Sequence, residues 1–317
     1  MYNPNITLEN LTKKTIKIPP PVNLGHGHWT SVGLRGITAM EKLVGFYLGA
    51  KFPKEVTHYT FDSPIVIEGH PDNNKGHVYK FDAGSDKAVL VFPQRSGAYS
   101  GARAVSAFLY SQGITAYEVI PPFLGQRGAL KKKGKRKSGI KSAKLSFKQV
   151  EQTYFQAVNE GHGIVNQIAT EKHIGCFGVS LGAQYASLLH GTSERTKAVC
   201  SFLGGGDLTL LIFNSEDKLP LYLRNCAKDM GMDEDAVRKY VAAIEPCNYV
   251  DTNRASDVLI YGADQDKAIP TSSTKALVDA WGEGVNYRTI SGNHKSVVWQ
   301  AKGLLQNLAA FYHQKLS

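Results

Sequence analysis

The sequence predicts an α/β domain with a doubly wound, mostly parallel sheet. Short apolar runs alternate with stretches whose apolar residues recur at helical spacing, which is typical of such sheets. The 317 residues are 42% hydrophobic and 20% charged, as in a globular protein that can bury a core without disulfides or metal. A helical stretch at about 205–255 interrupts the alternation, so we expect a small helical cap inserted into the domain.

The first half of the chain begins with a Pro-rich segment and then enters this alternation. AVLVF at 88–92 is a continuous apolar run, as expected for a strand buried on both faces. Gly113 is typical of a residue that closes a helix. In order, we expect a helix over 35–50, strands over 58–69, 76–82 and 88–92, a helix over 102–113 and a strand over 114–120.

The second half repeats strand and helix until the chain ends in a long helix. In order, we expect a helix over 147–169, a strand over 174–179, a helix over 182–190, strands over 198–204 and 257–262, a helix over 273–282, a strand over 286–292 and a helix over 296–316. No internal repeat is visible. We therefore divide the chain into an N-terminal extension at 1–55 and one domain at 56–317.

The net charge of +10 arises in one segment, a basic loop at 127–148. This loop holds ten of the 37 Lys and Arg residues and no acidic residue, and the rest of the chain balances 27 basic against 27 acidic residues. Because the charge is local, composition does not indicate a general nucleic-acid binder. We expect either a solvated tract or a surface for an anionic substrate, nucleic acid or an anionic membrane surface. The ten basic residues are Arg127, Lys131, Lys132, Lys133, Lys135, Arg136, Lys137, Lys141, Lys144 and Lys148.

Cysteine usage and the start of the chain bear on compartment and metal content. The four cysteines lie far apart without a C-x-x-C pair, which excludes a zinc ribbon and gives no sign of a disulfide framework. No apolar stretch approaches the roughly 20 residues that a bilayer requires, and no signal-peptide core is visible, so we expect a cytoplasmic protein. His26 and His28 alternate without further ligands, and we expect neither a metal nor an organic cofactor. The cysteines are Cys176, Cys200, Cys226 and Cys247.

A G-x-S-x-G motif at 178–182 lies directly between a predicted buried strand and a predicted helix. This is the context of a nucleophile elbow, in which a tight turn exposes the serine hydroxyl and small residues let the turn pack against its neighbours. The helix that follows directs free N–H groups and its positive dipole end toward the site. The sequence therefore predicts Ser180 as a nucleophile.

A serine nucleophile needs a histidine base, and an acid to hold that base. Three histidines follow Ser180 in the chain. His190 lies on the helix that begins at the elbow and cannot readily turn back, and His313 lies in the last helix. His294 follows the last predicted strand on a flexible turn, so elimination and position both favour it.

The acid is expected after a later strand than the serine, and YGADQDKAIP at 261–270 meets this condition. Asp264 and Asp266 are both available there. We prefer Asp266, and we interpret Asp264 as the residue that caps the turn. Asp207, in GGGDL after the preceding strand, is the remaining candidate.

From about residue 55 to the end, the chain resembles the α/β hydrolases, and within them the dienelactone-hydrolase and acetyl-esterase-like branch. The resemblance rests on AVLVFPQRSG, YEVIPPFLGQRG and GVSLG, and on the P-x-x-G-x-R pattern at 122–127. Asp266 in Asp-x-x-Ile-Pro matches the acid loop of this superfamily, and some members carry their acid near the position of Asp207. A serine at the elbow differs from the carboxylate of the dehalogenase and epoxide-hydrolase members.

The resemblance also implies an oxyanion hole formed by the backbone N–H of Leu181 and a second donor after AVLVF. Many relatives have His-Gly there, whereas this chain has Pro93-Gln94. Since proline has no N–H, Gln94 and Arg95 are the candidates. The implied activity is hydrolysis of a carboxylic ester through an acyl-enzyme. A thioesterase, peptidase or acyltransferase with the same triad stays open, as does a hydrolase-fold protein that binds anionic partners through its basic loop.

Overall fold

The computed structural model describes residues 1–17, 50–95, 100–124, 127, 130–132, 135–137 and 145–317. All but the last residue of the predicted helix at 35–50 lies outside these residues, as do His26, His28 and much of the basic loop. Within the described ranges, no helix is both long and apolar enough to cross a membrane.

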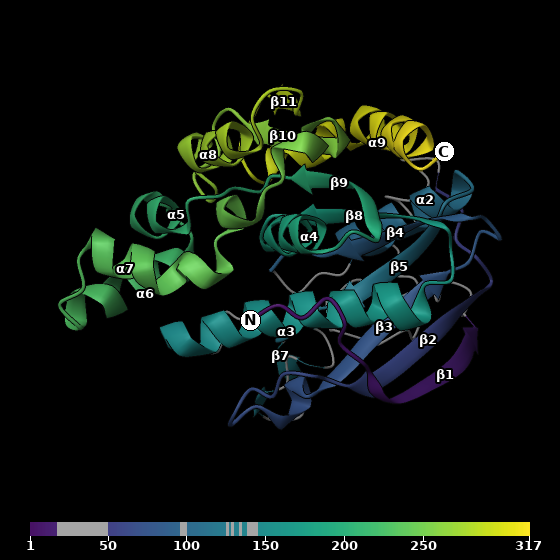
Figure 1. The fold of residues 1–317 in the computed structure, drawn as a ribbon, viewed down its shortest axis with the longest axis horizontal. Helices are drawn as coiled ribbons and strands as arrows, with labels where there is room; N and C mark the ends of the chain where they lie inside the picture. Colours follow the sequence, from purple (N-terminus) through teal and green to yellow (C-terminus); the bar gives the residue numbers. More distant parts are fainter. Residues whose placement is uncertain (18–49, 96–99, 125–126, 128–129, 133–134, 138–144) are drawn as a thin grey trace.

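A single large sheet forms the centre of the described structure, with strands in the order β1-β2-β3-β5-β4-β8-β9-β10-β11 (Figure 1). The strands from β5 to β11 in this order are parallel, whereas β1, β2 and β3 are antiparallel to their neighbours. The predicted doubly wound, mostly parallel sheet is thereby confirmed. The strands are β1 (Glu9–Lys17), β2 (Glu55–Asp62), β3 (Lys75–Phe81), β4 (Lys87–Phe92), β5 (Thr115–Ile120), β8 (His173–Val179), β9 (Thr196–Phe202), β10 (Val258–Ala263) and β11 (Asn286–Ile290).

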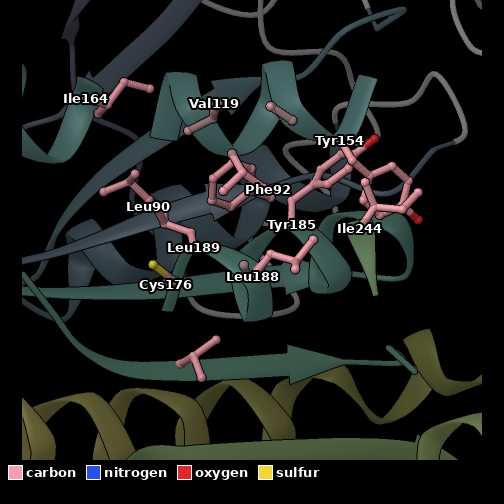
Figure 2. Close-up of a cluster of buried hydrophobic side chains, with 14 of the residues drawn as sticks. Leu90, Phe92, Val119, Tyr154, Ile164, Cys176, Tyr185, Leu188, Leu189 and Ile244 are labelled. Atoms are coloured by element: carbon pink, nitrogen blue, oxygen red, sulfur yellow. The ribbon is translucent and has the colours of Figure 1, made fainter. Parts of the chain in front are cut away.

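Helices cover both faces of the sheet because successive strand residues point to opposite faces and both sets are apolar. In β4, Val89 and Val91 pack on the face that carries α2 (Ser100–Ser111) and α9 (Ala301–Lys315). Leu90 and Phe92 point the other way, toward the side chains of the helices on that face (Figure 2). Those helices are α3 (Phe147–Gly163), α4 (Leu181–Thr192) and α8 (Thr271–Trp281).

Between β9 and β10 the chain forms three α-helices, α5 (Leu208–Asn214), α6 (Lys218–Asp229) and α7 (Glu234–Val241), followed by three short 3-10 helices. An aspartate caps each α-helix by accepting a backbone N–H: Asp207, Asp217 and Asp233. Figure 1 shows the three α-helices beyond the tip of β9, at the carboxyl-terminal end of the parallel strands. We call α5 to α7 the cap.

The N-terminal segment contributes to the sheet, which the sequence did not predict. Strand β1 pairs antiparallel with β2 at the edge of the sheet. Ahead of it, the Asn3 N–H donates to Asn159 on α3 at 2.7 Å, and the Tyr2 ring packs edge-on against Phe155 and Tyr249. The first 17 residues are therefore part of the same packed unit as the rest of the described chain.

Two other expectations need correction. The strand expected over 58–69 ends at Asp62, since Pro64 has no N–H to continue the ladder. Arg127, counted with the basic loop, is buried with 1% of its surface exposed. Its guanidinium donates to the Glu160 carboxylate at 2.7 and 2.8 Å and to the carbonyls of Ile120 and Asn73. Arg127 therefore joins the β5 loop to α3 and adds nothing to a surface charge.

Candidate active site

Ser180 lies at a sharp turn between β8 and α4 with φ 56° and ψ −118°, a positive-φ conformation that L-residues rarely adopt. The two motif glycines make this turn possible. A Cβ on Gly178 would lie 2.0 Å from the Gly182 carbonyl oxygen, and one on Gly182 would lie 2.3 Å from that of Phe92. The motif therefore has a steric cause: without a side chain at Gly178 the turn can close on itself, and without one at Gly182 it can pack under the end of β4.

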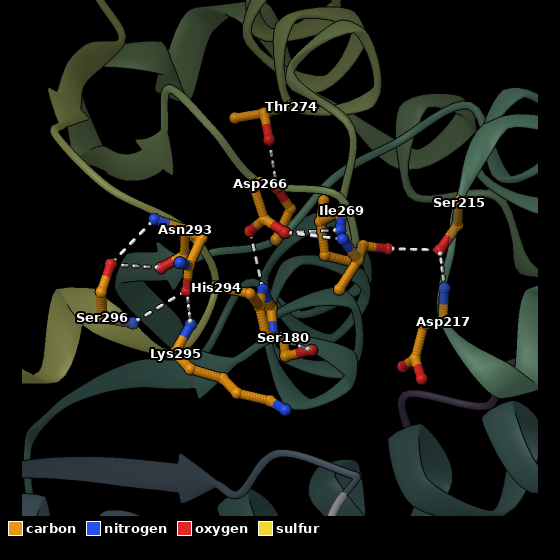
Figure 3. Close-up of polar contacts among 12 residues, drawn as sticks. Ser180, Ser215, Asp217, Asp266, Ile269, Thr274, Asn293, His294, Lys295 and Ser296 are labelled. Carbon is orange, nitrogen blue, oxygen red and sulfur yellow. Dashed lines mark hydrogen bonds and ion pairs between the residues drawn. The ribbon is translucent and has the colours of Figure 1, made fainter.

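A continuous chain of hydrogen bonds joins Ser180, His294 and Asp266 (Figure 3). The His294 Nε2 lies 3.1 Å from the Ser180 Oγ, and its Nδ1 lies 2.6 Å from the Asp266 Oδ2. The other carboxylate oxygen of Asp266 accepts the backbone N–H groups of Ala268 and Ile269, at 2.8 and 2.9 Å. Asp266 is buried, and these backbone hydrogen bonds hold its carboxyl group in place.

Asp264 makes different contacts, because it links the two loops that carry Asp266 and His294. Its carboxylate accepts the Gly292 N–H at 2.8 Å, and its own N–H donates to the Ile290 carbonyl at 3.0 Å. The Gln265 N–H donates to the Gly292 carbonyl at 3.0 Å as well. Asp264 thus faces the backbone of the histidine loop, and Asp266 faces the imidazole.

The other candidates from the sequence lie elsewhere. Asp207 caps α5, accepting the Leu210 N–H at 3.0 Å and the Arg238 guanidinium at 3.1 Å. His190 is buried beside Arg254, and burial, reinforced by that positive charge, holds its pKa well below the ordinary value. His313 is exposed on α9.

A mostly apolar pocket opens beside Ser180 and encloses about 690 Å³ of space between atoms, part of it open to solvent. Its walls come from α3, from α4 and from the cap. Leu181, Phe147 and Val150 line it on the domain side. The cap supplies Leu208, Leu211, Ile212, Leu219, Pro220, Leu223 and Val241.

The two candidates for the second oxyanion donor differ in their surroundings. Arg95 lines the pocket, and its guanidinium pairs with Asp217, the residue that caps α6. Burial alone would raise the pKa of Asp217, but the charge and hydrogen bond of Arg95 outweigh it and hold that pKa below the ordinary value. The Gln94 side chain lies instead near Gly101, at the start of α2. Leu181 is the first residue of α4, where a backbone N–H has no partner within the helix.

Four polar residues that line the pocket were not predicted from the sequence: Asp217, Glu151, Tyr154 and Gln184. The local sequence does mark Asp217 as a residue that could begin a helix, because an aspartate stands there directly before an amphipathic stretch. Its approach to Arg95, across 122 residues of chain, has no such local signal. Tyr154 and Gln184 give no sequence signal beyond helical spacing.

No protein-family model matches the chain, and no curated protein matches it. Solved structures do. An acetyl xylan esterase of Paenibacillus superimposes with a TM-score of 0.59 at 14% identity, over 86% of this chain and 93% of that one. An esterase of Pyrococcus furiosus gives 0.55 at 13%, over 96% and 99%. A Pyrococcus horikoshii acylaminoacyl peptidase gives 0.54 at 14%, over 84% and 40%. These likenesses establish the fold, which is the α/β-hydrolase fold.

Proposed function

We propose that this protein is a serine hydrolase that cleaves carboxylic esters through an acyl-enzyme. The observation that carries the proposal is the hydrogen-bonded chain of Ser180, His294 and Asp266 at the wall of an apolar pocket. An alcohol is a better leaving group than an amine, and the pocket offers mainly apolar contact to one side of the substrate. The better leaving group favours an ester over an amide. The apolar lining of the pocket favours an apolar acyl or alkyl group on that ester.

In the first half of the reaction, the Ser180 oxygen attacks the ester carbonyl while His294 Nε2 takes its proton. Asp266 holds the Nδ1 proton, so that Nε2 is the free acceptor, and it stabilises the imidazolium that forms. The Leu181 N–H and a second donor from the loop after β4 stabilise the oxyanion, each contributing about 3 kcal/mol. The alkoxide then leaves with the proton from His294.

In the second half, His294 activates a water molecule that attacks the acyl-enzyme, and the same oxyanion donors stabilise the second tetrahedral intermediate. Collapse returns the proton to Ser180 and releases the carboxylic acid. His294 therefore acts first as a base and then as an acid in each half of the reaction, which is why it must contact Ser180 and Asp266 together.

A panel of p-nitrophenyl esters from acetate to octanoate tests this proposal, with wild type and Ser180→Ala measured side by side. We expect turnover that is lost in the variant and that rises with chain length until the pocket is filled. Turnover that Ser180→Ala retains would refute it. If Ser180 reacts with a fluorophosphonate but the protein hydrolyses no ester of the panel, the result would point instead to a thioester or amide substrate.

A further inference from the structure

Gln184 is a polar residue of the pocket wall that takes no part in the triad. Gln184 lies one helical turn after Ser180 on α4, on the same face of the helix, and lines the pocket. Only 1% of its surface is exposed. A buried amide in a mostly apolar wall needs hydrogen-bond partners, because leaving it unsatisfied costs stability.

Tyr154 satisfies one end of this amide. Its hydroxyl, on α3, donates to the Gln184 Oε1, and its ring packs edge-on against Tyr185 with centroids 5.0 Å apart. The tyrosine is itself buried, so it holds the amide in one orientation. In the described part of the chain, the other end of the amide, Nε2, has no protein partner.

Building on the proposed function, we infer that Gln184 is a specificity-determining residue whose Nε2 donates a hydrogen bond to an uncharged oxygen of the substrate. The oxygen is a ketone, ether or hydroxyl within the otherwise apolar group that enters the pocket. Glu151 also lines the pocket and has no cationic partner among the described residues, so a carboxylate there would meet a like charge. Arg95, the cation that lines the pocket, is already paired with Asp217.

The spacing along α4 sets the position of that oxygen. Four residues of helix span about 6 Å along the axis, which matches a separation of several bonds from the scissile carbonyl. The experiment therefore compares p-nitrophenyl octanoate with its 4-oxo, 5-oxo and 6-oxo analogues. Because a site that hydrogen-bonds a substrate group rejects the analogue that lacks it, we expect kcat/KM of wild type to favour one oxo ester by about tenfold or more.

Three variants assign this preference to the amide. Gln184→Met keeps the length of the side chain without the donor. The ratio of kcat/KM for the preferred oxo ester to kcat/KM for the octanoate should therefore fall to about one. Tyr154→Phe frees the amide to rotate and should lower the ratio partway. Ser187→Ala is the matched control, since Ser187 is a buried polar residue of α4 outside the pocket wall, and it should leave the ratio unchanged.

The outcomes separate this inference from the proposed function. Hydrolysis of octanoate with no preference for any oxo ester would overturn the inference and leave the serine hydrolase standing. A preference that survives in Gln184→Met would also overturn it. No Ser180-dependent hydrolysis of any ester would overturn the proposed function, and the inference with it.

Discussion

Replacing Asp266 with asparagine should lower kcat by about 10⁴-fold while leaving the fold intact. The reason lies in how the carboxylate is held. One oxygen accepts the N–H groups of Ala268 and Ile269, and an asparagine oxygen would keep those two bonds. The asparagine NH₂ would then face His294 Nδ1, where the carboxylate oxygen now lies at 2.6 Å. A donor there selects the tautomer whose Nε2 carries the proton, and that nitrogen can no longer take the proton of Ser180.

Asp264→Asn is the matched control, two residues away on the same loop. Its side-chain oxygen can still accept the Gly292 N–H, so kcat should change by no more than about threefold. Both variants are assayed with the best p-nitrophenyl ester from the panel, with circular dichroism to verify folding. Equal losses in the two variants, or a larger loss in Asp264→Asn, would refute the assignment of Asp266 as the acid.

Three further predictions concern packing and charge. Gly182→Ala should remove activity and destabilise the fold, because its Cβ would lie 2.3 Å from the Phe92 carbonyl oxygen; a thermal melt and fluorophosphonate labelling measure both, and a stable, fully reactive variant would contradict the steric account. Glu160→Gln should cost about 3–5 kcal/mol of unfolding free energy in urea, since it leaves the buried Arg127 charge unpaired, and a loss under 1 kcal/mol would mean that water reaches this pair. Burial lowers the pKa of His162 from 6.5 to about 4. The unfolded chain therefore binds the extra proton first, so unfolding free energy should fall as the pH drops from 6.5 to 4, and less steeply in His162→Gln; identical slopes would contradict this.

Features whose causes are local in the chain were predictable from the sequence. The elbow is the best example, since the residues that shape its turn lie within five positions of one another. His294 could be reached by elimination, because few histidines follow Ser180. The choice between Asp264 and Asp266 was harder, since both follow the same strand and only the backbone geometry of that loop determines which carboxylate faces the imidazole.

Features that depend on distant pairing were not predictable. Strand β1 pairs with β2 across more than 30 intervening residues, and its exposed side chains give no apolar alternation to mark it. Arg127 belongs by sequence to a basic loop, and only its contact with Glu160 shows it to be a buried structural residue. The pocket arises where α3, α4 and the cap meet, so its polar residues can be recognised only once the chain is folded.

In the proposed mechanism, Ser180 is a nucleophile that His294 activates. The most direct measurement is intact-mass and peptide-mapping analysis of the protein after reaction with an alkyl fluorophosphonate, for wild type and His294→Ala. We expect one adduct per chain, located on Ser180, and labelling that is at least about a hundredfold slower in the variant. An adduct on another residue, or equal labelling rates in the two proteins, would contradict this mechanism.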